Sequence, residues 1–117
     1  MVAKVRLEFK LLSATKTTDG HTLTLNLKNV GNRILKSMVV RLHGPILNFP
    51  GETASCFVYA LMPGADENVT FRAFASSLKR VHFSVCGYVS GDSYFSIESP
   101  AMTVNARKAT EDNYILV

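Results

Sequence analysis

Residues 81–98 read VHFSVCGYVSGDSYFSIE, which is two apolar runs separated by a three-residue turn. In each run apolar residues alternate with polar or small ones, which is the pattern of a strand with one buried face. The loop at 90–92 has an odd number of residues, so it keeps Phe95 and Ile97 in phase with Val85, whereas a two-residue loop would bury their polar neighbours. Residues 81–98 therefore predict a β-hairpin with one apolar face.

The same period-two alternation occurs along most of the chain. Leu23, Leu25 and Leu27 alternate with polar residues, and turn residues such as Gly, Pro and Asn separate one alternating run from the next. Pro100 interrupts the last run, which marks a bulge or an edge position. We predict seven strands, at about residues 4–12, 21–29, 36–43, 53–61, 67–74, 81–89 and 93–104.

Length and composition agree with this pattern. The chain has 117 residues, of which 47% are hydrophobic and 19% charged, and these values are typical of one globular domain over residues 1–117. Seven short strands separated by turns predict an all-β fold, a seven-stranded antiparallel immunoglobulin-like β-sandwich.

Charge and hydropathy exclude several classes of partner. The net charge is only +4 and the basic residues are scattered, so we expect no nucleic-acid binding. No window holds the ~18 apolar residues that a bilayer crossing needs, so we expect no membrane insertion. Residues 1–6 (MVAKVR) lack the uninterrupted apolar stretch of a secretory signal.

Four short motifs carry a family resemblance, and they read LNLKNVGN at 25–32, MVVRL at 38–42, LMPG at 61–64 and NVTF at 68–71. Their order and spacing over residues 21–98 resemble the immunoglobulin-like CARDB modules of bacterial and archaeal surface proteins. The resemblance implies a seven-stranded sandwich that serves in cell adhesion or as a spacer, located at the cell surface.

The motif residues also have a purely structural interpretation. Asn29 and Gly31 suit the left-handed or tight conformations of a short turn between sheets. Pro63-Gly64 fits the two central positions of a type II turn. We therefore predict a structural role for these residues.

Three histidines, His21, His43 and His82, are the candidate metal ligands, because strand ends in an immunoglobulin-like topology can bring them together. His43 and His82 share the outward phase of their strands, whereas His21 is in phase with buried leucines. Each also fits a strand end, and the sequence places no carboxylate to orient the rings. We predict no metal site and no cofactor.

The pattern also favours a non-enzymatic protein. No Gly-x-Ser-x-Gly motif occurs, and the best nucleophile candidate, Cys86, lies in the middle of a strand. Cys86 faces away from the core, so a disulfide with Cys56 across the core is not expected. The two thiols are predicted to be separate.

Tyr88 and Tyr94 fall opposite each other near the tip of the last hairpin and are the candidate surface-contact residues; Tyr59 lies on another strand. Exposed aromatic rings bind protein partners or sugar rings, while a cross-strand aromatic pair that only stabilises the sheet is the simpler interpretation. We predict an interaction or structural module with a protein partner. The alternatives are a cytosolic domain that binds a peptide by edge-strand addition and a carbohydrate-binding module.

Overall fold

The computed structural model describes residues 5–16, 20–44, 55–73, 79–90, 93–104 and 107–108. Within these ranges the chain forms strands and no helix. The strands are β1 (Leu7–Lys16), β2 (His21–Asn29), β3 (Leu35–His43), β4 (Ser55–Leu61), β5 (Asp66–Ala73), β6 (Arg80–Val89), β7 (Ser93–Glu98), β8 (Met102–Thr103) and β9 (Arg107–Lys108).

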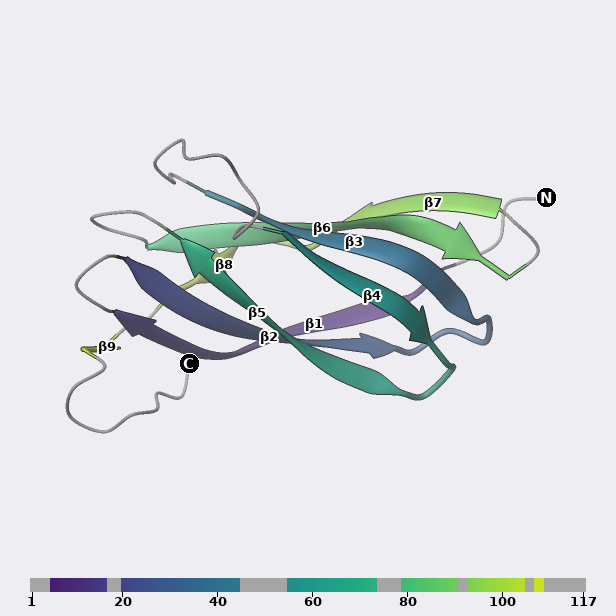
Figure 1. Cartoon of the computed structure of the whole chain (residues 1–117), viewed down its shortest axis with the longest axis horizontal. Helices are drawn as coiled ribbons and strands as arrows, with labels where there is room; N and C mark the ends of the chain where they lie inside the picture. Colours follow the sequence, from purple (N-terminus) through teal and green to yellow (C-terminus); the bar gives the residue numbers. More distant parts are fainter. Residues whose placement is uncertain are drawn as a thin grey trace.

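The strands form two sheets that lie face to face (Figure 1). One sheet has the order β5-β2-β1-β9, and the other has the order β4-β3-β6-β7, with β8 also paired to β6. The long neighbours are antiparallel, and β9 runs parallel to β1 over two residue pairs. The all-β prediction is confirmed. In the described part of the chain, nine strands replace the predicted seven, because β8 and β9 are separate two-residue strands.

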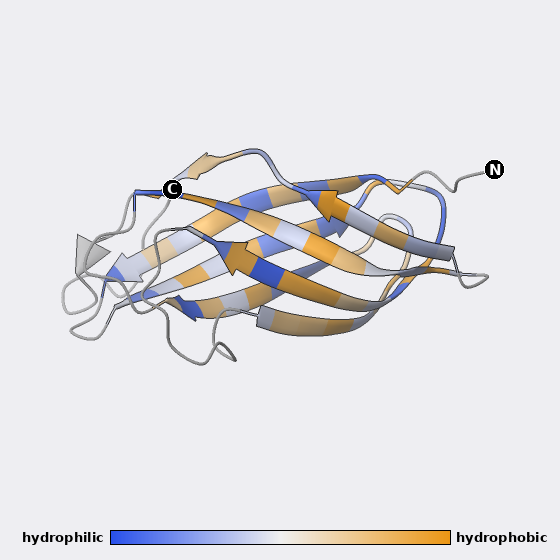
Figure 2. Ribbon diagram, turned by 90° about the horizontal axis from the view of Figure 1, so that it is seen from above, coloured by the Kyte–Doolittle hydropathy of each residue, from blue (hydrophilic) through white to orange (hydrophobic). Residues whose placement is uncertain are grey.

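The core lies between the sheets and follows from the alternation of side chains. Every second residue of β2 is buried, including Leu23, Leu25 and Leu27, and Figure 2 shows the same alternation of hydrophobic and hydrophilic residues along other strands. Phe71 of one sheet packs against Phe83 of the other, with ring centroids 5.4 Å apart. Each such fully buried side chain stabilises the fold by about 1.5–3 kcal/mol relative to exposure.

β1 begins and ends later than the predicted strand at 4–12, and a β-bulge lies within it. The strand continues to Lys16, past its expected end at residue 12, and its register against β2 shifts between Leu11 and Ser13. A bulge adds one residue to one strand, so the residues after it change faces and Ala14 becomes buried. The simple alternation of residues 4–11 cannot continue through such a shift.

The predicted hairpin register is confirmed, since Val85 lies opposite Ile97, whereas residues 91–92 of its loop lie outside the described residues. The last predicted strand, 93–104, is wrong as a single element. It ends at Glu98, where the buried hydroxyl of Ser99 accepts the Phe83 N–H at 2.8 Å in place of a strand carbonyl. After Pro100 the chain returns to β6 as β8.

The Pro63-Gly64 corner is the predicted type II turn. The N–H of Ala65 donates to the carbonyl of Met62 at 3.0 Å, and Gly64 has φ +82°. This φ is the value that the third residue of a type II turn requires, and it favours glycine.

Asn29 is structural for a different reason from the predicted one. Neither Asn29 nor Gly31 has a positive φ; instead, the buried Asn29 side chain joins two turns. Its Nδ2 donates to the carbonyls of Arg33 at 2.8 Å and Leu61 at 3.0 Å, and its Oδ1 accepts the Gly31 N–H at 3.0 Å. The side chain therefore fixes the β2–β3 turn against the end of β4.

A second bulge, in β3, requires a glycine on β6. Ser37 has φ +50°, and the β3–β6 register shifts between Lys36 and Val39. A Cβ on Gly87 would lie 2.8 Å from the Lys36 carbonyl oxygen and 2.9 Å from Met38 Cγ. Only glycine lets the two strands approach this closely.

Candidate functional site

The outer face of the β5-β2-β1 part of the first sheet is polar. Thr24 and Thr70 lie side by side with their hydroxyls 3.4 Å apart. The Asn26 side chain donates to Asp66 at 2.6 Å and to Asn68 at 2.8 Å. These groups satisfy one another or face water, as expected for the solvated side of an antiparallel sheet.

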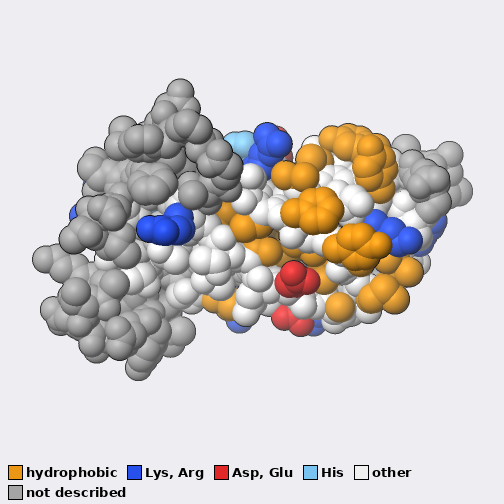
Figure 3. Space-filling view, viewed as in Figure 1, with side chains coloured by type: hydrophobic (Ala, Val, Ile, Leu, Met, Phe, Trp, Pro, Cys, Tyr) orange, Lys and Arg blue, Asp and Glu red, His pale blue; other side chains and the backbone are white. Residues whose placement is uncertain are grey.

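The outer face of the second sheet carries exposed apolar side chains instead. Phe57, Tyr59, Tyr88 and Tyr94 are 46–78% exposed, and Met62 follows β4 at the same end of the sheet. Figure 3 shows hydrophobic side chains gathered over β4 and the strands beside it. We call these five residues the aromatic face. Exposed apolar side chains that are clustered in this way, rather than scattered singly, mark contact surfaces.

The Tyr88–Tyr94 pair is formed as predicted. The two residues are direct cross-strand partners, with ring centroids 5.8 Å apart and ring planes at 71°. This edge-to-face geometry is one that aromatic pairs prefer, and it stabilises the hairpin by about 0.5–1.5 kcal/mol. Because the planes are far from parallel, the pair does not form a flat platform for a sugar ring.

The two cysteines are separate thiols, as predicted. Cys56 is packed against the core, where its thiol donates to the Thr70 carbonyl at 3.0 Å, and burial raises its pKa. Cys86 lies on the outer face opposite Val39 and Ser96. A hydrogen bond with Cys86 is the largest of the effects that raise the pKa of Tyr94.

The structure brings two of the three histidines together. His43 and His82 are cross-strand partners on the outer face of the second sheet, and their rings stack with centroids 4.7 Å apart. His21 is buried on the core side of β2 in the other sheet, so the three residues do not form one site. In the part of the chain that the structure describes, no three His, Cys, Asp or Glu side chains are placed to hold a metal ion.

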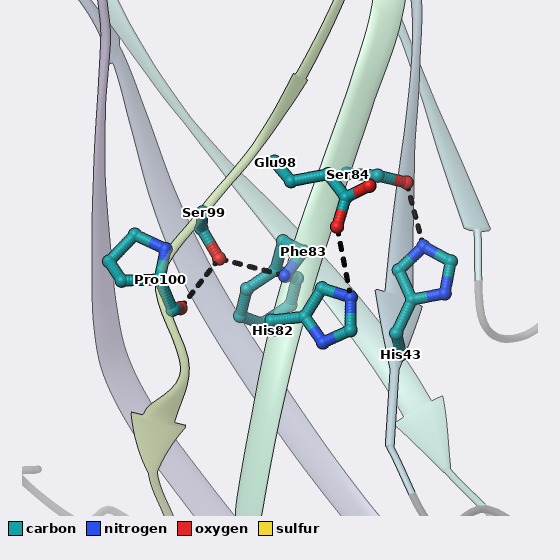
Figure 4. A network of polar contacts seen from close by, with 7 residues as sticks. All are labelled: His43, His82, Phe83, Ser84, Glu98, Ser99 and Pro100. Atoms are coloured by element: carbon teal, nitrogen blue, oxygen red, sulfur yellow. Dashed lines mark hydrogen bonds and ion pairs between the residues drawn. The ribbon is translucent and has the colours of Figure 1, made fainter.

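The histidine pair has two oxygen partners on neighbouring positions. His82 Nε2 lies 3.4 Å from Glu98 Oε1, and His43 Nε2 lies 2.7 Å from Ser84 Oγ (Figure 4). Burial lowers the pKa of His43, and electrostatic interaction with the neighbouring His82 lowers it further. Glu98 was missed in the sequence, although the hairpin register places it opposite Ser84 and diagonal to His82.

No helix in the described ranges is long and apolar enough to cross a membrane. No family model matches this chain. The curated proteins contain no match to it either.

Proposed function

We propose that this chain is a non-enzymatic, immunoglobulin-like interaction module that binds a protein partner through the aromatic face. The observation that carries the proposal is the contrast between the two outer faces. One face carries hydrogen-bonded Thr, Asn and Asp side chains, and the other, within the described residues, exposes the rings of Phe57, Tyr59, Tyr88 and Tyr94. Aromatic side chains dominate the binding energy of protein interfaces, because they bury large areas at a small entropic cost.

The strand order supports the immunoglobulin-like assignment. In such a sandwich the first, second and fifth strands share one sheet, and the third, sixth and seventh share the other. The orders β5-β2-β1 and β3-β6-β7 agree with this arrangement. β4 departs from the seven-stranded form, because it pairs with β3 in the second sheet instead of lying beside β5 in the first.

The resemblance to CARDB modules supports a place in a prokaryotic surface or adhesion-type protein. Two of its motifs, around Asn29 and around Pro63-Gly64, meet in one corner, where the backbone of Asn29 bonds to Ala65 and Gly64. These two backbone hydrogen bonds join the turn after β2 to the turn after β4, so both motifs stabilise the same corner of the fold. Surface location and adhesion follow from the resemblance alone.

A catalytic interpretation is weaker for a geometric reason. The distance between Ser84 Oγ and His43 Nε2, 2.7 Å, suits a nucleophile and its base. However, Ser84 lies inside β6, which is paired with β3 on one side and β7 on the other. Its backbone amides are used in the ladders, so they do not form an oxyanion hole beside the hydroxyl.

The proposal is tested by selecting peptides from a phage-displayed random library on the wild-type protein. We expect selected peptides to bind the Thr24→Ala/Thr70→Ala control equally well and the Tyr88→Ser/Tyr94→Ser variant at least about tenfold more weakly. Failure to enrich any peptide, or equal binding to both variants, would contradict the proposal. A glycan array run in parallel tests carbohydrate, and binding there alone would replace the proposed class of partner.

The alternative of strand addition is favoured by a separate observation. Strand addition needs a sheet edge without charge or proline. The β4 segment Ser55–Leu61 meets this requirement. Selected peptides that bind there would be unaffected by changes at Tyr88 and Tyr94.

A further inference from the structure

The open edges of the two sheets differ in how they are protected against pairing. A long edge without charges or proline is a template for another strand, and proteins normally block such edges. β5 carries Asp66, Glu67 and Arg72, and β1 carries charged residues and is partly covered by β9. β7 has six residues, ends in Glu98 and is followed by Pro100.

β4 has none of these protections. Its sequence, SCFVYAL over Ser55–Leu61, contains no charged residue, no proline and no glycine. Within the described residues its backbone pairs only with β3. Phe57 and Tyr59 project from it with 61% and 78% of their surface exposed, while Val58 between them faces the core.

We propose that β4 pairs antiparallel with β4 of a second copy of this chain, about a two-fold axis at Val58, so that the two β4-containing sheets become one continuous sheet. This inference goes beyond the proposed function and does not depend on it.

The sequence of β4 is self-complementary in this register. Antiparallel pairing about Val58 places Phe57 of each copy opposite Tyr59 of the other, on the outer face. Cross-strand aromatic pairs are favourable, and no like charges meet because the segment has none. The same register keeps Val58 on the core side in both copies, so the core is unchanged.

The net charge of +4 per copy does not prevent this contact. On the neighbouring strand β3, the positive charges of Lys36 and Arg41 lie opposite Ala60 and Ser55 of β4. Across the pair, β3 of one copy is three strand spacings from β3 of the other, which is about 14 Å. This separation exceeds the Debye length of about 8 Å at physiological ionic strength, so the repulsion is largely screened.

The exposed area of the β4 side chains indicates how tightly two copies of the chain would bind. With about 200 Å² for a fully exposed ring side chain, Phe57 and Tyr59 expose about 280 Å² per copy. A standard stable interface buries about 800 Å² per partner. The dimer is therefore weak, with a dissociation constant in the micromolar to millimolar range.

Sedimentation velocity over a concentration series tests the proposal with a matched pair of variants. Tyr59→Lys places a charge on the β4 edge. Tyr94→Lys places the same charge at another exposed tyrosine, 63% exposed compared with 78% for Tyr59, on the edge strand β7 of the same face. Phe57→Lys is a second edge variant, and circular dichroism checks that all three proteins keep the β-fold.

We expect the wild type and Tyr94→Lys to dimerise over the same concentration range, and both edge variants to need at least tenfold higher concentration. Three results would overturn the proposal. The wild type could remain monomeric up to about 1 mM, the edge variants could dimerise like the wild type, or Tyr94→Lys could weaken the dimer as much as Tyr59→Lys. The last result would indicate face-to-face contact. The peptide selection described above is scored with changes at Tyr88 and Tyr94, whereas the dimer is scored with changes at Phe57 and Tyr59. Failure of one proposal can therefore be distinguished from failure of the other.

Discussion

Replacing Asn29 with alanine should lower the free energy of unfolding by about 2–4 kcal/mol. Asn29 is only 1% exposed, and the change removes all three hydrogen bonds of its side chain. The Leu61 carbonyl loses its Asn29 partner in a buried position, while the Arg33 carbonyl and the Gly31 N–H are partly buried. A polar group left unsatisfied in the interior costs about 1–3 kcal/mol, and the partly buried groups recover some of this through water.

Urea unfolding followed by far-ultraviolet circular dichroism measures this change, because the chain has no tryptophan. Asn32→Ala is the matched control, since Asn32 is exposed in the same turn. We expect the control to change stability by less than about 0.5 kcal/mol. A loss below about 1 kcal/mol for Asn29→Ala would refute the argument that this side chain holds the two turns together.

Asn29→Asp separates hydrogen bonding from shape. The aspartate keeps the oxygen that accepts the Gly31 N–H but turns a second oxygen toward the carbonyls of Arg33 and Leu61. Burial and this repulsion raise the pKa of the introduced carboxyl group in the folded state, so stability should rise as the pH falls and the group becomes protonated. If the free energy of unfolding of Asn29→Asp differed from that of the wild type by the same amount at pH 4 and at pH 7, this prediction would be contradicted.

Three further predictions concern packing, the strand break and pH. Gly87→Ala should lower the free energy of unfolding by about 1–3 kcal/mol in urea, because its Cβ would lie 2.8 Å from the Lys36 carbonyl oxygen; a neutral effect would show that the β3 bulge can move. Ser99→Ala should cost about 1–3 kcal/mol by leaving the Phe83 N–H unsatisfied, whereas Ser96→Ala on the exposed face should be nearly neutral, and equal costs would be inconsistent with the hydroxyl replacing a ladder acceptor. Because the folded pKa of His43 is lowered below 6.5, the unfolded chain binds this proton first, so the contribution of His43 to stability should fall as the pH decreases through 6.5 and stay low below the folded pKa. His43→Gln should flatten this part of the stability profile, and an NMR titration that places the His43 pKa at or above 6.5 would disprove the prediction.

Much of the fold could be predicted from the sequence because it depends on local periodicity. The burial of Leu23, Leu25 and Leu27 follows from the two-residue repeat of a strand, and the opposition of Tyr88 and Tyr94 follows from the length of one loop. Both are consequences of short-range geometry. The type II turn at Pro63-Gly64 is equally local.

The parts that could not be predicted depend on contacts between distant residues. The bulges at Leu11/Ser13 and at Ser37 shift the phase of β1 and β3, and no residue pattern in either strand marks them. Gly87 was the available signal for the second bulge, since a glycine inside a strand often marks close approach of another backbone. The placement of β4 beside β3, which creates the aromatic face, depends on long-range pairing that alternation does not encode.

NMR chemical-shift mapping, in which the selected peptides are titrated into the isotope-labelled protein, identifies the surface that binds them. We expect the shifts to cluster on Phe57, Tyr88 and Tyr94 and to leave the Thr24–Thr70 face unchanged. Shifts centred on Thr24, Asn26 and Thr70, with the aromatic residues unaffected, would contradict it.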